Sequence, residues 1–415
     1  MEARVVSVNL LGLIKNTPVE WKALGEVGEF IRGNGMQKKD FVEEGFPAIH
    51  YGQIYTKYGL EASESFTFVS DELASKLKKA KTGDLIIATT SENVKDVGKS
   101  LVWLGKSDVA IGGHACVYSS SKIKSKYLAY YMLTNDFQKA KIKKLIGTKV
   151  IELYPKKIAE IKIPIPSKEI QEKIVEVLDK MTEYVTELTT ELTTELTYRN
   201  KQYDYYRDLL LSEESLSKVG FEWKTLMDAS EKVMTGVTPL ARNREFYDEG
   251  TISWLRTNEV RFNEIFETDI LVTQKALIET TLKLIPINCV IVAISGATAG
   301  RIAINKIPLT TNQHCCSFAV KDDEINYRYM YYYLCAFNKQ IIKMKQGARG
   351  DINMGMLKKF KIAVPLREEQ SRIVEILDKI DTLINSTSEG LLKEIELRQK
   401  QYEYYRELLL GFNQN

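Results

Sequence analysis

The feature that most constrains this chain of 415 residues is a long stretch that occurs twice. Residues 169–211 and 368–410 share Ile-Val-Glu-x-Leu-Asp-Lys near their starts and Lys-Gln-Tyr-x-Tyr-Tyr-Arg-x-Leu-Leu-Leu at their ends. The two copies keep a constant offset of 199 residues, so neither copy has gained or lost a residue relative to the other. The length of the stretch has therefore been held fixed.

Each copy is predicted to form one long helix. Apolar residues in the first copy recur in steps of three and four, and no proline interrupts either copy. Pro166 and Pro365 precede the two starts, and Ser167 is the expected N-cap of the first helix. A helix of 43 residues is about 65 Å long, which exceeds a single globular core. We expect the two copies to pair antiparallel about a pseudo-twofold axis, with a generic coiled coil as the alternative.

A region of short apolar strands precedes each helix. Residues 20–166 have strands such as 85–88 and 115–118 and a helix at about 124–145. Residues 221–365 repeat this plan with strands at 290–293 and 315–318 and a helix near 326–345, and the repeat is circular. The predicted fold class is α+β, with two mixed α/β domains separated by two long antiparallel coiled-coil helices. The domain boundaries follow as 1–166, 167–212, 213–365 and 366–415.

Inside the first long helix lies a perfect tandem of three Thr-Glu-Leu-Thr units, at 186–197. Its leucines, Leu188, Leu192 and Leu196, are four residues apart and stay on one helix face. One interpretation is ordinary helix generated by repeat slippage. The other is a length adjuster, because each unit lengthens the helix by about 6 Å without moving the apolar stripe far.

Charge and composition limit the class of protein. The long helices carry net charges of −5 and −4, so the rest of the chain carries +12 although the whole carries only +3. The five cysteines lack C-x-x-C spacing and are expected to be reduced core thiols, and three histidines with scattered thiols predict no metal site. No run of 18 apolar residues and no signal peptide is evident, which predicts a cytoplasmic protein without membrane contact.

The duplicated helices, their shared endings, the tandem and the two unlike domains together resemble the specificity subunit of type I restriction-modification enzymes. The resemblance covers essentially the whole chain. It implies two target-recognition domains that each bind one half of a split site on double-stranded DNA. It also implies helices that set the gap and dock two modification (methyltransferase) subunits, with restriction subunits joining through the complex. S-adenosylmethionine is then expected on the methyltransferase partner and ATP and Mg on the restriction partner, with no cofactor in this chain.

The resemblance implies no catalysis in this chain, and the residues agree. Gly105-Lys106-Ser107 lacks the upstream glycine of a phosphate loop. The segment 295–301 lacks the G-x-G-x-x-G pattern, and either it is a plain tight turn or its glycines let the backbone approach DNA while Thr298 and Arg301 point outward. An enzyme acting alone on nucleic acid would need a carboxylate or metal constellation, and none is visible.

Candidate DNA-binding residues lie on loops at strand and helix ends. Lys149 and Arg349 each follow a glycine in equivalent loops, and Lys143, Lys144 and Lys345 are nearby phosphate candidates, although charge runs are usually solvated helix faces. A histidine two residues before a buried cysteine is more often a hydrogen-bonded part of the fold than a base contact. With that reservation, the base-reading candidates are Thr90, Ser91, His114, Asn312, Gln313 and His314.

The helix endings combine tyrosine and arginine, which favour protein interfaces. Whether they face the opposing helix or a partner subunit is open at this point. The competing hypothesis for the whole chain is a non-catalytic coiled-coil scaffold with nonspecific nucleic-acid binding. The candidate interface residues are Tyr203, Tyr206, Arg207, Tyr402, Tyr405 and Arg406.

Overall fold

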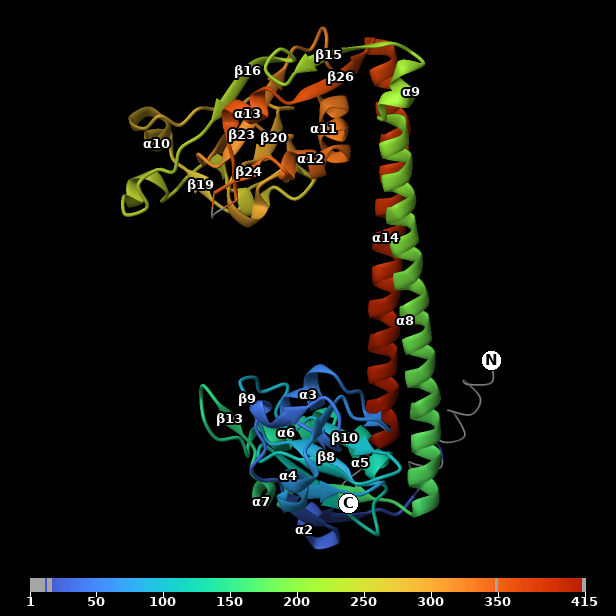
Figure 1. The fold of residues 1–415 in the computed structure, drawn as a ribbon. Coiled ribbons are helices and arrows are strands. Elements are labelled where there is room, and N and C mark those ends of the chain that lie inside the picture. The colour runs from blue at the N-terminus through green and yellow to red at the C-terminus, as the bar shows by residue number, and fades with distance from the viewer. Residues whose placement is uncertain (1–11, 13–16, 348–349, 413–415) are drawn as a thin grey trace. The chain divides into compact units, whose positions relative to one another are not determined.

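The computed structural model describes Gly12, residues 17–347 and residues 350–412 (Figure 1). The chain forms two compact units. The first comprises Met1–Leu192 with Lys393–Asn415, and the second comprises Thr193–Leu392. Each unit therefore contains part of both long helices, α8 (Lys168–Leu210) and α14 (Arg367–Leu410), together with one region of strands and short helices.

The main sheet of the first unit has the strand order β2-β12-β8-β10-β5, and all its neighbours are antiparallel except β10 and β5. A second sheet has the order β3-β6-β4-β11-β7, and the pairs β1–β14 and β13–β9 complete the unit. The strands are β1 (Glu20–Ala23), β2 (Glu29–Arg32), β3 (Phe41–Val42), β4 (Phe46–Ile49), β5 (Glu61–Ala62), β6 (Thr67–Val69), β7 (Lys78–Ala80), β8 (Leu85–Ala88), β9 (Thr90–Ser91), β10 (Ser100–Trp103), β11 (Val109–Ile111), β12 (Ala115–Ser119), β13 (Ile151–Glu152) and β14 (Lys162–Ile165). The short helices are α2 (Leu24–Val27), η1 (Lys38–Asp40), α3 (Tyr51–Thr56), α4 (Asp71–Lys76), α5 (Ser125–Tyr131), α6 (Asn135–Ile142) and α7 (Pro155–Ala159).

The second unit repeats the main sheet with the order β16-β23-β20-β21-β18, again antiparallel except for its last pair. A smaller sheet, β19-β17-β22, and the pairs β15–β26 and β24–β25 accompany it. The strands are β15 (Phe221–Thr225), β16 (Ser230–Thr235), β17 (Ile252–Leu255), β18 (Asn263–Ile265), β19 (Leu271–Val272), β20 (Val290–Ala293), β21 (Ile302–Asn305), β22 (Thr310–Thr311), β23 (Cys315–Val320), β24 (Lys345–Gln346), β25 (Asp351–Ile352) and β26 (Lys361–Pro365). The short helices are α9 (Glu213–Ser217), η2 (Arg244–Phe246), η3 (Thr257–Glu259), α10 (Gln274–Glu279), η4 (Gly296–Thr298), α11 (Tyr327–Ala336), α12 (Asn338–Ile342) and α13 (Met354–Lys358).

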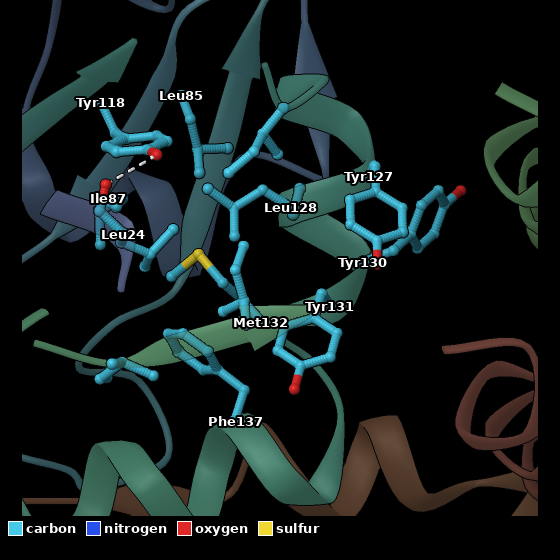
Figure 2. Close-up of a cluster of buried hydrophobic side chains, with 14 of the residues drawn as sticks. Leu24, Leu85, Ile87, Tyr118, Tyr127, Leu128, Tyr130, Tyr131, Met132 and Phe137 are labelled. Carbon is cyan, nitrogen blue, oxygen red and sulfur yellow. Dashed lines mark hydrogen bonds between the residues drawn. The ribbon is translucent and has the colours of Figure 1, made fainter. Parts of the chain in front are cut away.

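The central strand of each main sheet is buried on both faces, as its unbroken aliphatic run predicts. In the first unit Leu85 and Ile87 face the cluster formed with α5, α6 and the long helices (Figure 2). Ile86 and Ala88, on the opposite face of the strand, pack with residues of the second sheet. The cysteines are core thiols as predicted: all five are unpaired and only Cys335 is less than fully buried.

The long helices run antiparallel within each unit, as predicted. In the first unit Ile174 and Leu178 near the start of α8 pack in one cluster with Leu409 near the end of α14. In the second unit Leu211, just after α8, packs with Leu377 near the start of α14. The predicted N-cap is also present, because the Ser167 hydroxyl accepts a hydrogen bond from the Ile170 amide at 3.4 Å.

The Thr-Glu-Leu-Thr tandem lies in the uninterrupted part of α8. Leu188, Leu192 and Leu196 are all partly buried, which is the pattern of a helix seam. Hydroxyls of its threonines donate to the carbonyl four residues earlier, for example Thr190 to Thr186 at 2.8 Å. These bonds satisfy the threonine side chains inside the helix.

Two predicted helices were wrong in their extent. The expected helix at 124–145 is two helices, α5 and α6, which are separated at Thr134. The Thr134 hydroxyl donates to the Tyr131 carbonyl at 2.7 Å at the end of α5, and it accepts from the Phe137 amide at 3.4 Å as the N-cap of α6. The expected helix at 326–345 is likewise α11 and α12, separated at Phe337, whose backbone has φ −93° and ψ 15°.

Candidate nucleic-acid interface

One backbone frame gathers the loop candidates of the first unit at the end of strand β8. The Thr89 amide donates to the His114 carbonyl at 2.8 Å, and the Leu153 amide donates to the Thr89 carbonyl at 2.9 Å. The Gly98 amide donates to the Ala88 carbonyl at 2.8 Å. Segments far apart in the sequence therefore meet at one edge of the sheet.

The second unit builds the same frame from different residues. The Ile294 amide donates to the His314 carbonyl at 2.9 Å, and the Ile352 amide donates to the Ile294 carbonyl at 2.8 Å. The Gly300 amide returns to the Ala293 carbonyl at 2.8 Å. The two sets of candidates thus occupy corresponding places on one scaffold.

On the first frame only one of the three polar base-reading candidates is exposed. Thr90 and Ser91 are 6% and 5% exposed, whereas His114 is exposed. The Thr90 hydroxyl lies 3.0 Å from Nδ1 of His114, and the Tyr51 ring centroid lies 5.0 Å from that of His114. Thr90 therefore orients the imidazole, and the side chains available at the surface are His114 and Tyr51.

Tyr51 is a residue that sequence reasoning missed, although the pair His50-Tyr51 directly follows strand β4. The His50 ring lies 4.4 Å from the Tyr51 ring, and its Nδ1 accepts the Gly52 amide at 3.2 Å. Burial, with the charges of Lys38 and His114, holds the pKa of His50 below its ordinary value. A neutral His50 thus fixes the start of α3 and supports Tyr51.

The structure brings Lys149 to the same edge. The residues that follow it form β13, in which Ile151 pairs with Ser91 of β9. Gly147 starts the turn with φ +96°, and a Cβ there would lie 2.0 Å from the Val150 carbonyl oxygen. Lys149 is exposed on this hairpin, whereas its counterpart Arg349 lies outside the described residues.

In the second unit the segment 295–301 is tied to the hairpin that contains Lys345. The Gly296 amide donates to Oδ1 of Asp351 at 3.0 Å, and Lys345 pairs with Ile352 across that hairpin. The Thr298 hydroxyl donates to the Ser295 carbonyl at 3.2 Å, and Arg301 is partly buried. The segment contains the short helix η4 and has φ +65° at Gly296.

The remaining base-reading candidates surround the turn before β23. Asn312 is only 8% exposed, and its Oδ1 accepts the His314 amide at 3.1 Å. Gln313 is exposed and accepts the Thr238 hydroxyl at 2.6 Å, while His314 is partly buried. Asn312 shapes the turn, and Gln313 and His314 are the side chains that reach the surface.

Lysines in the run after residue 138 differ sharply in environment. Lys143 is exposed, whereas Lys144 forms an ion pair with Glu160. Lys141 is 1% exposed, and its Nζ donates to the Val94 and Val97 carbonyls, each at 3.0 Å. Burial lowers the pKa of Lys141 to about 8. Lys141 therefore serves the fold, whereas Lys139 and Lys143 are the exposed members of the run and are available to a ligand.

The tyrosine and arginine motif divides into an inner and an outer set. Arg207 stacks over the Tyr203 ring and Arg406 over the Tyr402 ring, each with its guanidinium 5.5 Å from the ring centroid. Both arginine side chains are less than 15% exposed. The most exposed members of the motif are Tyr205 and Tyr404, which lie in the same two helix endings. The exposed fractions are 62% for Tyr205, 42% for Tyr206 and 63% for Tyr404, and Tyr405 is partly buried.

Within residues 17–347 and 350–412, together with Gly12, no three or more His, Cys, Asp and Glu side chains form a group that could hold a metal ion. In the same part of the chain, no helix is both long and apolar enough to cross a membrane.

Two units that repeat one sheet topology and one loop frame, each built on parts of two duplicated helices, define a duplicated two-domain protein with two different loop surfaces. A family model described as a type I restriction modification DNA specificity domain matches residues 17–198 and again residues 218–397. The chain therefore belongs to the family of type I restriction-modification specificity subunits, which confirms the resemblance seen in its duplicated motifs.

Individual relatives extend over nearly the whole chain. The chain is 33% identical over 418 residues to the Escherichia coli type I restriction enzyme EcoR124I/EcoR124II specificity subunit, covering 96% of both chains. It is 30% identical over 417 residues to a putative type I restriction enzyme specificity subunit of Haemophilus influenzae, covering 97% of both.

Solved structures share the fold. A chain from a structure of a type I R-M system superposes with a TM-score of 0.72 at 16% identity, covering 95% of this chain and 99% of that chain. The HsdS subunit from Thermoanaerobacter tengcongensis gives a TM-score of 0.55 at 15% identity, covering 95% of this chain and 97% of the other. These likenesses confirm the predicted α+β architecture.

Proposed function

We propose that each unit binds one half of a bipartite site on double-stranded DNA through its loop frame and that this chain performs no catalysis itself. The observation that carries the proposal is the shared frame with different side chains: His114 and Tyr51 in one unit, Gln313 and His314 in the other. One scaffold with two side-chain sets suits two different base sequences, because base edges are read by side chains and not by the fold.

Phosphate contacts come from the cations around each frame. Lys149 projects from the hairpin beside Ser91, and Lys143 lies exposed at the end of α6. Lys345 lies in the corresponding hairpin of the second unit, and Arg301 is the last residue of the segment 295–301. Arg349, which follows Gly347 in the sequence, is the counterpart of Lys149. Most specific DNA-binding proteins position themselves through such contacts.

The long helices supply the spacing and the partner surface. Each Thr-Glu-Leu-Thr unit adds about 6 Å of helix, so loss of one unit changes the gap between half-sites by a base pair or so. Two methyltransferase subunits dock on the exposed tyrosines, including Tyr205 and Tyr404, and restriction subunits join through the complex. S-adenosylmethionine binds the methyltransferase partner and ATP and Mg the restriction partner, and the assembly works in the cytoplasm.

Methylation-sensitive sequencing of the host genome tests the proposal. The expected result is one modified motif made of two short blocks around a fixed gap, which disappears when the gene for this chain is deleted. A complex that binds or methylates DNA without sequence preference would contradict the proposal and favour a scaffold.

Lys149→Ala tests the phosphate contact. The variant is expected to weaken binding equally at all DNA sequences and to reduce the slope of log K against log salt by about one. Lys180→Ala removes an exposed lysine from the long helix and serves as the control. A salt slope that Lys149→Ala leaves unchanged removes Lys149 from the contact set.

A further inference from the structure

A chain of charged side chains joins the main sheet of the first unit to the long helix α8. The main sheet of each unit is called its recognition sheet below. The Lys126 Nζ lies 2.5 Å from Oε2 of Glu61 and 2.8 Å from Oδ2 of Asp179. Glu61 lies on the edge strand β5, Lys126 on α5 and Asp179 on α8. The Tyr130 hydroxyl adds a hydrogen bond to Oδ1 of Asp179 at 2.7 Å.

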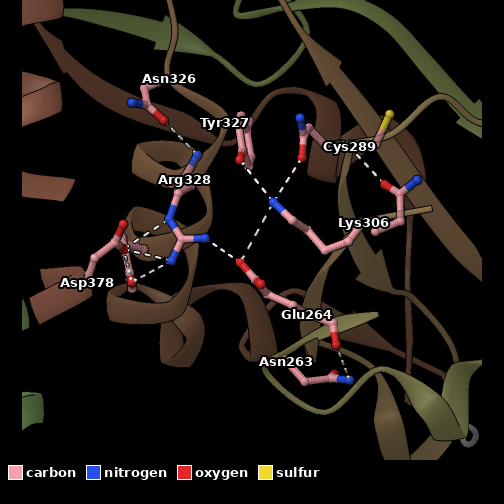
Figure 3. A network of polar contacts seen from close by, with 11 residues as sticks. Asn263, Glu264, Cys289, Lys306, Asn326, Tyr327, Arg328 and Asp378 are labelled. Carbon is pink, nitrogen blue, oxygen red and sulfur yellow. Dashed lines mark hydrogen bonds and ion pairs between the residues drawn. The ribbon is translucent and has the colours of Figure 1, made fainter. Parts of the chain in front are cut away.

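The second unit contains the same chain, shown in Figure 3. The Arg328 guanidinium forms an ion pair with Glu264 and donates from Nε and Nη2 to Oδ1 of Asp378 at 2.9 and 2.7 Å. The Tyr332 hydroxyl donates to the same oxygen at 2.5 Å. Again the three charged groups come from the edge strand, β18, the packed helix, α11, and the long helix, α14.

Further attachments recur in both units. The Gln171 side chain accepts the Lys124 amide at 2.8 Å and donates to the Lys122 and Pro166 carbonyls at 3.1 and 2.9 Å. Gln370 makes the corresponding three bonds in the second unit. In each copy this glutamine lies eight residues before the aspartate, about 12 Å along the helix, so two separated points attach the same domain to its long helix.

The charged chain is poorly suited to be a simple source of stability. Lys126, Glu61 and Asp179 are 25%, 41% and 34% exposed at their side chains, and ion pairs of such exposure contribute little to the free energy of unfolding. Both units preserve the same three-way connection: the helix packed on the sheet is linked to the edge strand of the sheet and also to the long helix. Because the two domains share little sequence outside the long helices, an ion-pair arrangement that recurs in both indicates a task that both domains share.

We propose that Lys126 and Arg328 are positioning residues that fix the angle of each recognition sheet on its own segment of the long helix. Through that angle they set the position along the DNA at which each loop frame contacts its half-site. The inference rests on the proposed reading of a bipartite site. The inference adds that the gap between half-sites is specified by helix length and also by two clamps, which are the ion-pair chains Glu61–Lys126–Asp179 and Glu264–Arg328–Asp378.

The test uses the full chain assembled with its methyltransferase subunits and duplex oligonucleotides that carry the motif found by methylation sequencing. The duplexes have the natural gap or a gap one base pair longer or shorter, and methylation rates are compared for wild type and Lys126→Met. We expect the preference for the natural gap to fall about fivefold to tenfold, equivalent to about 1–1.4 kcal/mol, while the bases preferred within each half-site stay the same.

Three controls separate positioning from folding. Lys126→Arg keeps the cation and is expected to restore gap preference. Lys180→Met removes a neighbouring exposed lysine and the Glu176 pair without touching the recognition sheet, and is expected to keep wild-type preference. Arg328→Met makes the same test in the second unit, with Lys379→Met as its control.

The outcomes distinguish the inference from the proposed function. Wild-type gap preference in both Lys126→Met and Arg328→Met overturns the positioning role and leaves the proposed function standing. A wild-type complex with no preference for any motif or gap overturns the proposed function itself. A melting temperature of Lys126→Met close to that of Lys180→Met, with only the first losing gap preference, supports positioning.

Discussion

Gln171→Met is the most direct test of how the first recognition domain is held to its helix. Gln171 is 0% exposed, and its amide makes three hydrogen bonds to backbone groups of Lys122, Lys124 and Pro166. Methionine has a similar shape but offers the backbone no comparable partner. Each lost bond costs about 0.5–1.5 kcal/mol, and because water reaches the exposed Lys122 and Lys124, we expect a total of about 2–4 kcal/mol.

Hydrogen exchange measured by mass spectrometry resolves this loss locally, which a single melting curve of a two-unit protein does not. Peptides that cover residues 120–135 are expected to exchange about 30- to 800-fold faster, as a loss of about 2–4 kcal/mol requires. Peptides of the second unit should be unchanged, and Gln370→Met should give the reverse pattern. Gln202→Met, at an exposed position of the same helix, is the matched control. Exchange at 120–135 no faster than in this control would refute the reasoning.

Three further perturbations follow from the structure. Burial lowers the pKa of Lys141 in the folded protein to about 8 from an ordinary 10.5, so the unfolded chain binds more protons between pH 8 and pH 10.5. The free energy of unfolding of wild type should therefore rise by up to about 3 kcal/mol relative to Lys141→Met as pH increases through that window, as measured by urea titration. Gly147→Ala should destabilise its hairpin by about 1–3 kcal/mol, measured by hydrogen exchange. The loss should exceed that of the control Gly83→Ala, because Gly83 also has a positive φ of +91° but has open space where the Cβ would lie. Tyr205→Ala should change stability by less than about 0.5 kcal/mol yet weaken co-purification with the methyltransferase subunit, and a full-strength complex would exclude Tyr205 from that interface.

The long helices were predictable because their signal is local and repeated. The apolar period, the absence of proline and the N-cap Ser167 all act within a few residues, and the same pattern recurs in the second copy at an offset of 199 residues. The central strands at 85–88 and 290–293 were predictable for the same reason, since continuous aliphatic runs are buried wherever the chain places them. Even the antiparallel pairing followed from the need of each apolar stripe for a partner.

The helix breaks and the roles of single polar residues were decided by tertiary structure. Thr134 ends α5 only because its hydroxyl finds both the Tyr131 carbonyl and the Phe137 amide. Lys141 and Lys143 look alike in the sequence, yet one is buried against two carbonyls and the other is exposed.

The sequence by itself thus determined the repeated architecture and the family, because hydrophobic periodicity and duplication are properties of the chain read in order. It named His114, Gln313 and Lys149 as candidates, but only the folded sheets decide which side chains reach the surface. The clamps of Glu61, Lys126 and Asp179 were hidden for the same reason. Their members are more than 50 residues apart, and only long-range packing brings the three charges within hydrogen-bonding distance.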